Sequence, residues 1–343
     1  MTKTSGFQHW VSYAKGIAIL LVVYRHILYG IDRTELEVEN YLMVANEIFY
    51  SFRMPLFFIL SGIFVRKSMA KRNGWQFIKT KISTILYPYI VWCVIQITLQ
   101  IGLSNYTNSD RTLFDFVYIF IQPRALDQMW FLMALFNTTL IFFFLDGVLK
   151  LKNWHLIVIS IILHYVSGYV TQFSLIHDPL YFLMFFVLGV VGSKYLLSIE
   201  NKPKLSSIKY LLLILPFFIG SQIVWIIYGR DLQIFLFALV ELVGSYFTII
   251  LCFRLEKLGI LGFLKRAGDY SLPVYLTHAL FGAAIRIVLM KFAGIENVLV
   301  LLISGIALST LAGIILYNLA RKYGLMWLFF MPDLKKKSLS NAS

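Results

Sequence analysis

An arginine and a histidine interrupt the first apolar stretch of the chain, and they are the first candidates for chemistry. Arg25 and His26 follow a run of uncharged residues that begins after Lys15. A charged arginine near the centre of a bilayer costs about 2.5–3.5 kcal/mol, so its presence there indicates a use. Lys15 precedes His26 by eleven residues. This spacing is within roughly 20° of three helical turns, so both side chains share one helix face, about 16 Å apart.

Other polar or ionisable side chains also fall inside apolar stretches. In lipid such groups are costly when isolated, so we expect them to face the interior of a helix bundle and to have partners there. We interpret His164 as a packing residue, and the Glu241 carboxylate as a neutralising partner of Arg286 or Arg25. His278 is compatible with either a helix–helix contact or the lining of a site. The residues concerned are His164, Glu241, His278, Arg53 and Arg286.

The second apolar stretch contains a proline beside its arginine. Pro55 follows Arg53 and Met54, and because proline lacks an N–H and crowds the preceding turn, we expect a kinked helix that presents Arg53 to the interior. Ser61 and Gly62 offer a notch where a neighbouring helix can pack closely. This segment therefore reads either as a packing element or as the bent wall of a cavity.

The composition is that of a membrane protein. Of 343 residues, 59% are hydrophobic and only 14% are charged, and apolar runs close to the length of a bilayer span recur throughout. We predict an all-α membrane protein, a bundle of about ten transmembrane helices forming one domain over residues 1–343. The predicted spans are 14–31, 47–66, 83–103, 129–149, 154–171, 179–198, 209–228, 231–253, 270–292 and 297–320.

The basic residues are distributed unevenly between the loops. With the N-terminus placed in the cytoplasm, 23 of the 31 lysines and arginines fall on the cytoplasmic side, five on the other side and three within spans. This bias predicts that both termini are cytoplasmic. The net charge of +14 is therefore a topology signal, and we expect no nucleic acid as a partner. Residues 104–128 form the longest predicted outer loop, with a short interfacial helix at 113–121.

Several common catalytic arrangements are missing from the sequence. Cys93 and Cys252 both lie in apolar segments, as buried free thiols do, and neither has a neighbouring base that would activate it. No metal-ligand spacing, phosphate-binding loop or nucleophile-elbow motif is present. We therefore expect no metal cofactor. Ser61 is the one notable hydroxyl near a kink, and direct group transfer is favoured over a covalent intermediate.

Several of these segments, taken in order, resemble the membrane-bound acyltransferase 3 family of bacterial enzymes that acylate cell-surface carbohydrates. The resemblance covers most of the chain, and the number of predicted spans also matches. The matching motifs are the cation eleven residues before His26, Phe-Arg53-Met54-Pro55-Leu-Phe-Phe with Ser61-Gly62, Lys79-Thr-Lys81 before Leu86-Tyr87-Pro88-Tyr89, Trp130-Phe-Leu-Met-Ala-Leu, and Tyr275-Leu-Thr-His278.

The chain departs from the family pattern at three positions. Lys15 stands where the family usually has arginine, so a bidentate grip on phosphate or carboxylate is lost there. Thr84 stands where a second basic residue is typical, and Arg53 where histidine is common.

The resemblance implies an O-acyltransferase that moves an acyl group, acetyl above all, from acyl-CoA to a sugar hydroxyl of a cell-surface polysaccharide or its lipid-linked precursor. The implied partners are the lipid bilayer, acetyl-CoA and a carbohydrate acceptor, and the implied location is the bacterial cytoplasmic membrane, crossed several times. Which glycan is modified, whether the group is acetyl or succinyl, and on which side transfer occurs stay open.

The chemistry of the residues fits this reaction. A sugar hydroxyl is a poor nucleophile, and a neutral imidazole with a pKa near about 6.5 suits the role of general base, which we assign to His26. Arg25 or Arg53 would stabilise the oxyanion. Cations on the cytoplasmic side would attract the donor phosphates. The donor-binding candidates are Lys15, Lys79 and Lys81, and the candidates that line the substrate site are Glu241, His278, Arg286 and Trp130.

Two other function classes compete with this reading. In a secondary transporter or flippase, the buried histidine, glutamate and arginine groups would form a proton relay. The sequence lacks the internal repeats and matched helix breaks that many transporters show. A glycan polymerase would be expected to carry a large basic outer loop. The loop at 104–128 instead has only Arg111 and Arg124 against three aspartates.

Overall fold

The computed structural model describes residues 8–104 and 111–332. The basic residues Lys3, Lys335, Lys336 and Lys337, and part of the predicted outer loop, lie outside this range. The described chain is helical and contains no strand. Its α-helices are α1 (His9–Asp32), α2 (Asn40–Ala70), α3 (Gly74–Lys81), α4 (Tyr87–Gly102), α5 (Tyr118–Ile121), α6 (Trp130–Phe142), α7 (Asn153–Ser167), α8 (Ser174–Leu196), α9 (Lys202–Leu205), α10 (Ile208–Tyr228), α11 (Ile234–Leu258), α12 (Gly262–Asp269), α13 (Ser271–Ile287) and α14 (Val298–Lys322).

Tighter or wider helical turns connect or extend several of these helices. The 3₁₀ segments are η3 (Leu113–Val117), η4 (Pro123–Met129), η6 (Gly229–Asp231) and η8 (Met326–Leu328). The π-helical segments are η1 (Ile82–Leu86), η5 (Phe143–Val148) and η7 (Val288–Phe292). Through η1, the helices α3 and α4 form one continuous helical segment over Gly74–Gly102.

Nine helical segments of the described chain are long and apolar enough to cross a membrane. The prediction of an all-α membrane protein is thus confirmed, whereas the cytoplasmic placement of the termini stays a prediction. The fifth predicted span, 154–171, corresponds to α7, which has 15 residues, fewer than the roughly 20 that a span needs. Several helices are longer than the predicted spans, because polar residues next to an apolar run can also be helical. Helix α2, for example, begins at Asn40, seven residues before the predicted span.

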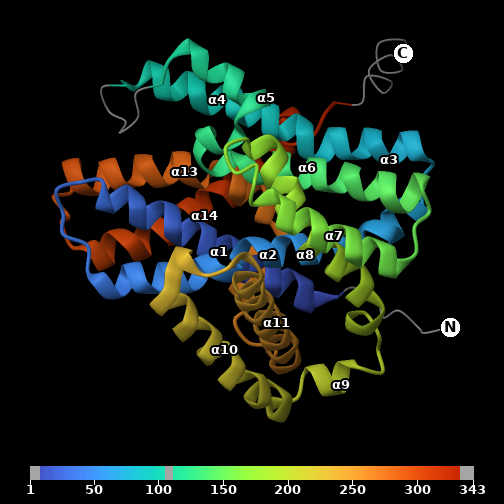
Figure 1. Ribbon diagram of the computed structural model, residues 1–343. Helices are drawn as coiled ribbons and strands as arrows, with labels where there is room; N and C mark the ends of the chain where they lie inside the picture. The colour runs from blue at the N-terminus through green and yellow to red at the C-terminus, as the bar shows by residue number, and fades with distance from the viewer. Residues whose placement is uncertain (1–7, 105–110, 333–343) are drawn as a thin grey trace.

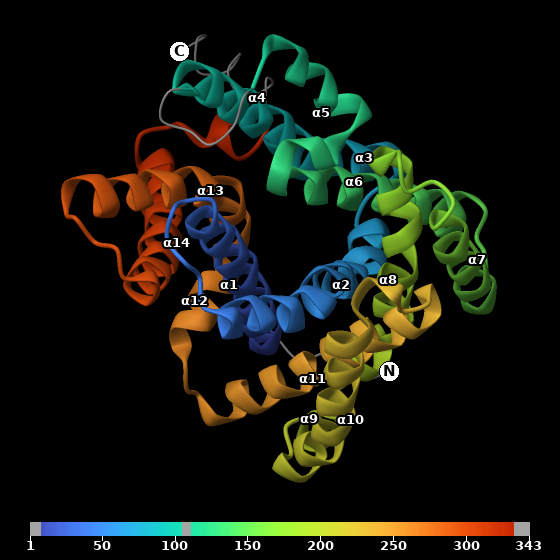
Figure 2. The ribbon, with the colours of Figure 1, turned by 60° about the vertical axis from the view of Figure 1, so that its left-hand side comes forward.

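The long helices surround a central region rather than a single packed axis. Figure 2 shows α1 and α2 on one side of this region, α4 and α6 opposite, and α8 and α13 between them. Helix α10 projects from the bundle, and only 11% of its most apolar 18-residue stretch is buried. That surface suits contact with lipid.

Close packing of α2 against α8 depends on glycine. A Cβ atom at Gly62 would collide with the carbonyl oxygen of Phe186, and one at Gly189 with that of Ile59. Between helices in a membrane, such close backbone approach supplies van der Waals contact where hydrophobic burial contributes little. The notch expected at Ser61 and Gly62 is therefore the place where α8 packs.

Aromatic rings extend this contact to α6. The rings of Phe58 and Phe182 stack with centroids 4.3 Å apart, and Trp130 also stacks with Phe182, at 5.7 Å. Stacked aromatic pairs add about 0.5–1.5 kcal/mol beyond the burial of their area. These contacts link Trp130, the first residue of α6, to α8, and α8 in turn to α2.

The predicted interfacial helix at 113–121 is present as η3 followed by α5 (Figure 1). It exposes apolar side chains at Leu113, Phe114, Phe120 and Ile121. Apolar side chains exposed on a short segment beside the spans suit the headgroup region of a bilayer.

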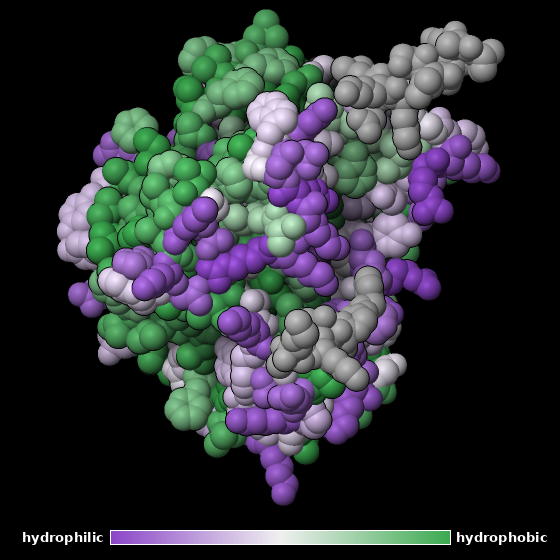
Figure 3. Space-filling model, turned by 90° about the vertical axis from the view of Figure 1, so that its right-hand side faces the viewer, coloured by the Kyte–Doolittle hydropathy of each residue, from purple (hydrophilic) through white to green (hydrophobic). Residues whose placement is uncertain are grey.

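Most described basic residues lie at one end of the bundle, which we call the basic end: residues 66–81, 150–152, 194–209, 254–266 and 321–322. Figure 3 faces this end, and hydrophilic side chains run across it. Two ion pairs link its elements: Arg66 with Asp146 at 2.6 Å, and Lys202 with Glu256 at 3.0 Å. The opposite end, where α1 finishes and α2 begins, holds the cavity.

Candidate functional site

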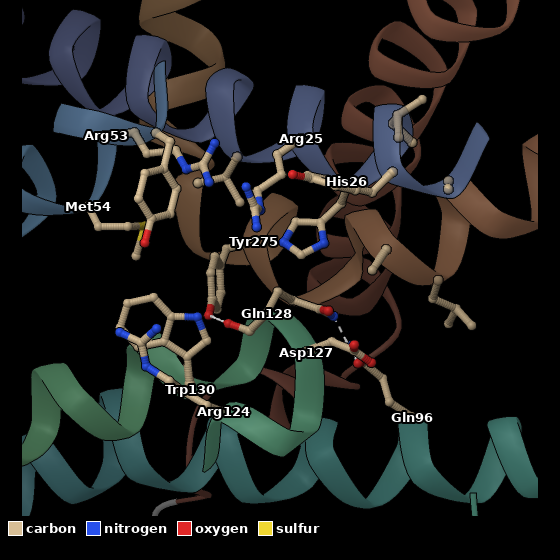
Figure 4. Close-up of a pocket in the computed structure, with 18 of the residues that line it drawn as sticks. Arg25, His26, Arg53, Met54, Gln96, Arg124, Asp127, Gln128, Trp130 and Tyr275 are labelled. Carbon is tan, nitrogen blue, oxygen red and sulfur yellow. Dashed lines mark hydrogen bonds between the residues drawn. The ribbon is translucent and has the colours of Figure 1, made fainter. Parts of the chain in front are cut away.

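A cavity of about 870 Å³ opens among the helices, lined by residues of α1, α2, α4, η4, α6, α8, α11 and α13. This volume is near the upper limit of the about 300–1,000 Å³ that small-molecule sites occupy. Figure 4 shows its two facing walls, with Arg25, His26 and Arg53 on one side, Arg124, Asp127, Gln128 and Trp130 on the other, and Tyr275 between them.

His26 lies on the α1 wall of the cavity. Its side chain is half-buried, and no described residue makes a hydrogen bond to its ring. The nearest ring partner is His278 on α13, whose centroid is 5.1 Å away at an angle of 60°. His26 therefore presents ring nitrogens that a bound molecule can reach, as a general base requires.

His278 is fixed in one tautomer by the backbone. Its Nδ1 lies 2.7 Å from the carbonyl oxygen of Tyr275 and 3.1 Å from that of Val274. Because a carbonyl only accepts, Nδ1 carries the proton and Nε2 keeps a lone pair. Nε2 is buried and has no partner among the described residues. His278 does not line the cavity; it stands behind His26, so its role is a contact with that ring.

Two arginines flank His26 from α1 and α2. The Arg25 guanidinium lies 4.5 Å from the ring centre of Tyr29 and 5.4 Å from that of Tyr50. The side chain of Arg53 is buried, with 3% exposed, and donates to Oδ1 of Asn46 at 3.4 Å. Neither forms an ion pair within residues 8–104 and 111–332. Arg25 is held by aromatic rings and Arg53 by the amide of Asn46. Glu47 interacts electrostatically with Arg53 but forms no ion pair with it.

Further arginines surround the mouth of the cavity. Arg286 on α13 donates a hydrogen bond to the carbonyl oxygen of Gly30. Arg33 and Arg230 are exposed there, and Arg124 pairs with the buried carboxylate of Asp178 at 2.8 Å. The guanidinium of Arg124 also lies 4.3 Å from the ring centre of Trp130.

The wall opposite His26 is built by η4 and supported by amide side chains. Gln128 donates to Gln96 at 2.9 Å, and Gln96 donates to the carbonyl oxygen of Leu276 at 3.0 Å. Tyr275 donates to the carbonyl oxygen of Gln128. These bonds join η4, α4 and α13 at the cavity (Figure 4).

Asp127 in this wall has an unusual backbone conformation. Its φ of 52° and ψ of −122° lie in a region that residues other than glycine adopt only at a cost of about 1–3 kcal/mol. The conformation is held by an ion pair with Arg111 at 3.0 Å. Arg111 also binds Asp115 at 3.0 Å.

Asp115 anchors the loop that carries this wall. The backbone N–H of Thr112 donates to its carboxylate at 2.7 Å, and this bond, with those from Arg111 and the Thr112 hydroxyl, lowers the pKa of Asp115 below its ordinary value. The carboxylate therefore stays charged and keeps η3 attached to Arg111 at neutral pH.

The expected pairing of Glu241 with an arginine is wrong. The Glu241 carboxylate is buried and accepts a hydrogen bond from the hydroxyl of Tyr181 at 2.7 Å, and no ion pair of the described chain includes it. Sequence fixes the depth of a side chain in a span but not the direction in which its helix faces. Glu241 still lines the cavity, between α11 and α8. His164, in contrast, packs as expected, with Nδ1 2.9 Å from the carbonyl oxygen of Tyr181.

The structure brings together some of the predicted site residues and separates others. His26, Arg25, Arg53, Glu241, Arg286 and Trp130 all line the cavity. The predicted donor-binding residues Lys15, Lys79 and Lys81 do not line it. Lys15, in the first half of α1, interacts electrostatically with Asp269 at the end of α12. Lys81 lies over the ring of Phe77 at 5.3 Å.

Sequence reasoning missed three arginines of the cavity. The predicted spans leave Arg33, Arg124 and Arg230 in loops on the side with few cations, and loop cations are ordinarily solvated. Their position could have revealed them. The positive-inside rule explains cations in cytoplasmic loops, so arginines in loops on the opposite side need another explanation. Gln96, Gln128 and Tyr50 gave no signal, since polar and aromatic residues are common at span ends.

A family model for an acyltransferase domain, that of the acyltransferase 3 family, matches residues 8–318. The nodulation protein NolL of Mesorhizobium japonicum is 25% identical to the chain over 143 residues. This alignment covers 41% of the chain and 37% of NolL, so the chain matches little more than a third of that relative. No solved structure matches the chain.

Proposed function

The chain belongs to the acyltransferase 3 family, and from this premise we propose that it is a membrane O-acyltransferase that moves an acetyl group from acetyl-CoA to a sugar hydroxyl. The acceptor is a cell-surface polysaccharide or its lipid-linked precursor. The observation that carries the proposal is His26, a half-buried imidazole on the wall of a large cavity, flanked by Arg25 and Arg53.

In the proposed reaction His26 is the general base. As the sugar oxygen attacks the thioester carbonyl carbon, its proton passes to the imidazole. When the tetrahedral intermediate collapses, the carbon–sulfur bond breaks and the imidazolium returns the proton to the thiolate of CoA. No covalent acyl-enzyme is needed, because the one base serves both steps.

Arg25 and Arg53 stabilise the intermediate in this proposal. Their guanidinium groups lie on the same wall as His26 (Figure 4) and have no carboxylate partner within the described chain. An uncompensated cation in a site screened from water stabilises the developing oxyanion without further reorganisation. Removing one such donor typically lowers kcat by about 100–1,000-fold.

His278 acts on His26 as a positioning residue. Its Nε2 lone pair is buried within a ring pair of 5.1 Å centroid separation. The two rings are not hydrogen-bonded in the structure. In the proposed mechanism the imidazolium formed during proton transfer would turn an N–H toward this lone pair, as the histidine of a serine protease triad does toward its carboxylate.

The donor phosphates are assigned to the basic end. Lys15 lies on the His26 face of α1, about 16 Å away along the helix, and Lys79 and Lys81 belong to the basic end. CoA carries its phosphates far from its thioester, at the other end of the pantetheine arm. A donor held by these cations would therefore place its reactive carbonyl deep in the bundle.

The test uses the full-length protein in lipid nanodiscs with [¹⁴C]acetyl-CoA and a panel of oligosaccharide acceptors. We expect labelled sugar in the presence of an acceptor and slow release of free CoA in its absence. His26→Ala should remove both while the protein keeps its helical circular dichroism. Gradient-driven uptake of a glycan into vesicles, without acetyl transfer, would instead identify a transporter.

A cellular measurement addresses the acceptor. Acetyl groups of the surface glycans, counted by NMR in strains with and without the gene, should differ at one type of sugar hydroxyl. An unchanged acetyl content in every glycan fraction would contradict the proposed activity.

A further inference from the structure

We propose that the cavity binds an anionic acceptor, a sugar that carries a phosphate, diphosphate or carboxylate group, and that the arginines around its mouth recognise this group. The inference deepens the proposed function and rests on it: it names the chemical class of the acceptor. Neither the family nor the reaction requires an acceptor of this charge.

The first observation is the charge of the lining. Of the described residues that line the cavity, six are arginines and two are acids, Asp127 and Glu241. Asp127 is already paired with Arg111, and Glu241 with the Tyr181 hydroxyl. No acid of the lining is left to balance the arginines.

The second observation is how the arginines are held. Arg124 has a carboxylate partner, Asp178, whereas the other five form no ion pair within residues 8–104 and 111–332: Arg25, Arg33, Arg53, Arg230 and Arg286. Those with described partners contact an amide, a backbone carbonyl or aromatic rings. Neutral partners orient a guanidinium but leave its charge free. Glu47 interacts electrostatically with Arg53, yet it lies outside the lining and forms no ion pair with that arginine. A cluster of like charges at low dielectric is unfavourable unless an anion enters it.

The third observation is the gradient of exposure. Arg33 and Arg230 are exposed at the mouth, Arg25 and Arg286 are half-buried, and Arg53 is buried. Arg33 interacts electrostatically with Arg286, and Arg25 with Arg53. The charges therefore form a path from the mouth to His26, which steers an anion inward.

The residue type fits the same ligand. All the cations of the lining are arginine, although lysine is the commoner choice at the basic end. A guanidinium binds phosphate or carboxylate through two parallel hydrogen bonds, which fix the orientation of the ligand as well as its position. Oriented in this way, an anionic group would present one particular hydroxyl to His26.

The aromatic wall supplies the complementary contact for a sugar ring. Trp130, Tyr181 and Phe182 line the cavity, and their flat apolar faces suit the C–H face of a pyranose. The arginines would bind the charged substituent while the rings hold the sugar.

The experiment compares matched acceptors with the full-length protein in nanodiscs. One pair is a disaccharide with a hexuronate and the same disaccharide with that carboxylate reduced to a hydroxymethyl group. The other pair is a disaccharide on polyprenyl diphosphate and the same disaccharide on an uncharged polyprenyl ether. We expect kcat/KM to be at least about tenfold higher for the charged member of one pair, and the pair that responds identifies whether the anion belongs to the sugar or to the lipid carrier.

Arginine variants test whether the lining causes the preference. In Arg286→Gln the KM for the charged acceptor should rise about tenfold, and in the exposed Arg230→Gln about threefold, while the KM for acetyl-CoA stays constant. Arg286→Lys should keep part of the preference. Lys291→Gln, which removes a cation five residues after Arg286 in the chain and outside the lining, is the control and should leave both KM values unchanged. At saturating acetyl-CoA, raising NaCl from 50 to about 500 mM should raise the KM for the charged acceptor and leave the KM for its neutral match unchanged.

The outcomes separate the two proposals. Equal kcat/KM for the charged and neutral members of both pairs would overturn the anionic acceptor and leave the acetyltransferase intact. A rise in the KM for acetyl-CoA in the arginine variants, with the acceptor KM unchanged, would assign the arginines to the donor and also overturn it. Absence of both acetyl transfer and CoA release with every acceptor would overturn the proposed function itself, and the acceptor class with it.

Discussion

The two ends of the bundle carry charge of the same sign but hold it in different ways. At the basic end, lysines are numerous and exposed, and Arg66 and Lys202 are paired with Asp146 and Glu256. At the cavity end every cation of the lining is arginine, and five of the six described ones have no carboxylate partner. Flexible, solvated lysines suffice to set orientation in a membrane. Oriented guanidinium groups without anions point to a ligand that supplies the anion.

The difference also separates structure from chemistry. Neutralising a solvated lysine removes a small, screened interaction. Neutralising a guanidinium that faces the cavity removes a directed interaction at low dielectric. The comparison thus predicts large effects on activity at one end and small effects at the other.

The largest effect is expected at His26. The variant His26→Ala should lower kcat for acetyl transfer by roughly 100–10,000-fold, since it removes the general base. Initial rates with [¹⁴C]acetyl-CoA and the best acceptor measure the change. His155→Ala, on α7 and outside the cavity lining, should keep the wild-type rate. A His26 variant that retained the wild-type kcat would show that the base lies elsewhere.

The next largest effect sharpens the comparison directly. Arg53→Gln should lower kcat about 100-fold because it removes a buried positive charge beside His26. Arg53→Lys keeps the charge but loses the planar guanidinium, so its kcat should lie between those of the wild type and Arg53→Gln. At the basic end, Lys209→Gln should change kcat less than about twofold. Similar losses in Arg53→Gln and Lys209→Gln would erase the distinction between the two ends.

Sequence predicted the fold well because long apolar runs in a membrane protein have few alternatives to helix. Nine of the ten predicted spans correspond to long helices of the described chain. The remaining one, α7, shares its apolar composition but ends at Ser167. Apolar composition alone does not fix the length of a helix.

The site was predicted less evenly, for a physical reason. A charge inside an apolar run is conspicuous, so His26, Arg25, Arg53 and Arg286 stood out, and all four line the cavity. A charge in a loop is ordinary, so Arg230 did not. The Glu241 partner was wrong because hydropathy gives depth and not the facing of helices.

A moderate effect is expected behind the base. His278→Leu removes the buried Nε2 lone pair beside His26 while filling similar volume, and should lower kcat about tenfold with little change in either KM. His278→Gln, which can still accept a hydrogen bond, should recover part of the rate. A residue that only packs would lower the melting temperature in both variants and leave kcat unchanged.

The smallest effect is expected at the loop that holds the wall opposite His26. Hydrogen bonds from Thr112 and Arg111 lower the pKa of Asp115. The stability that this carboxylate contributes is therefore fully present above its unfolded pKa of about 3.9 and is lost as pH falls through the lower folded value. Protection of the amides in residues 111–129, measured as their exchange rate relative to that of unprotected amides at the same pH, should be constant from pH 7 to about 5. It should fall below about pH 4. Asp115→Asn should accelerate exchange at pH 7 already, with less than about a threefold loss of activity, because the loop supports the cavity wall without bearing the base.

The control for this loop is Asp231→Asn, which changes an exposed carboxylate of η6 and should leave exchange in residues 111–129 unchanged. If the Asp115 variant matched the wild type at neutral pH, the ion pairs of Arg111 would not be what holds this wall, and the cavity end would owe its shape to the amide and tyrosine bonds of Gln96, Gln128 and Tyr275 alone.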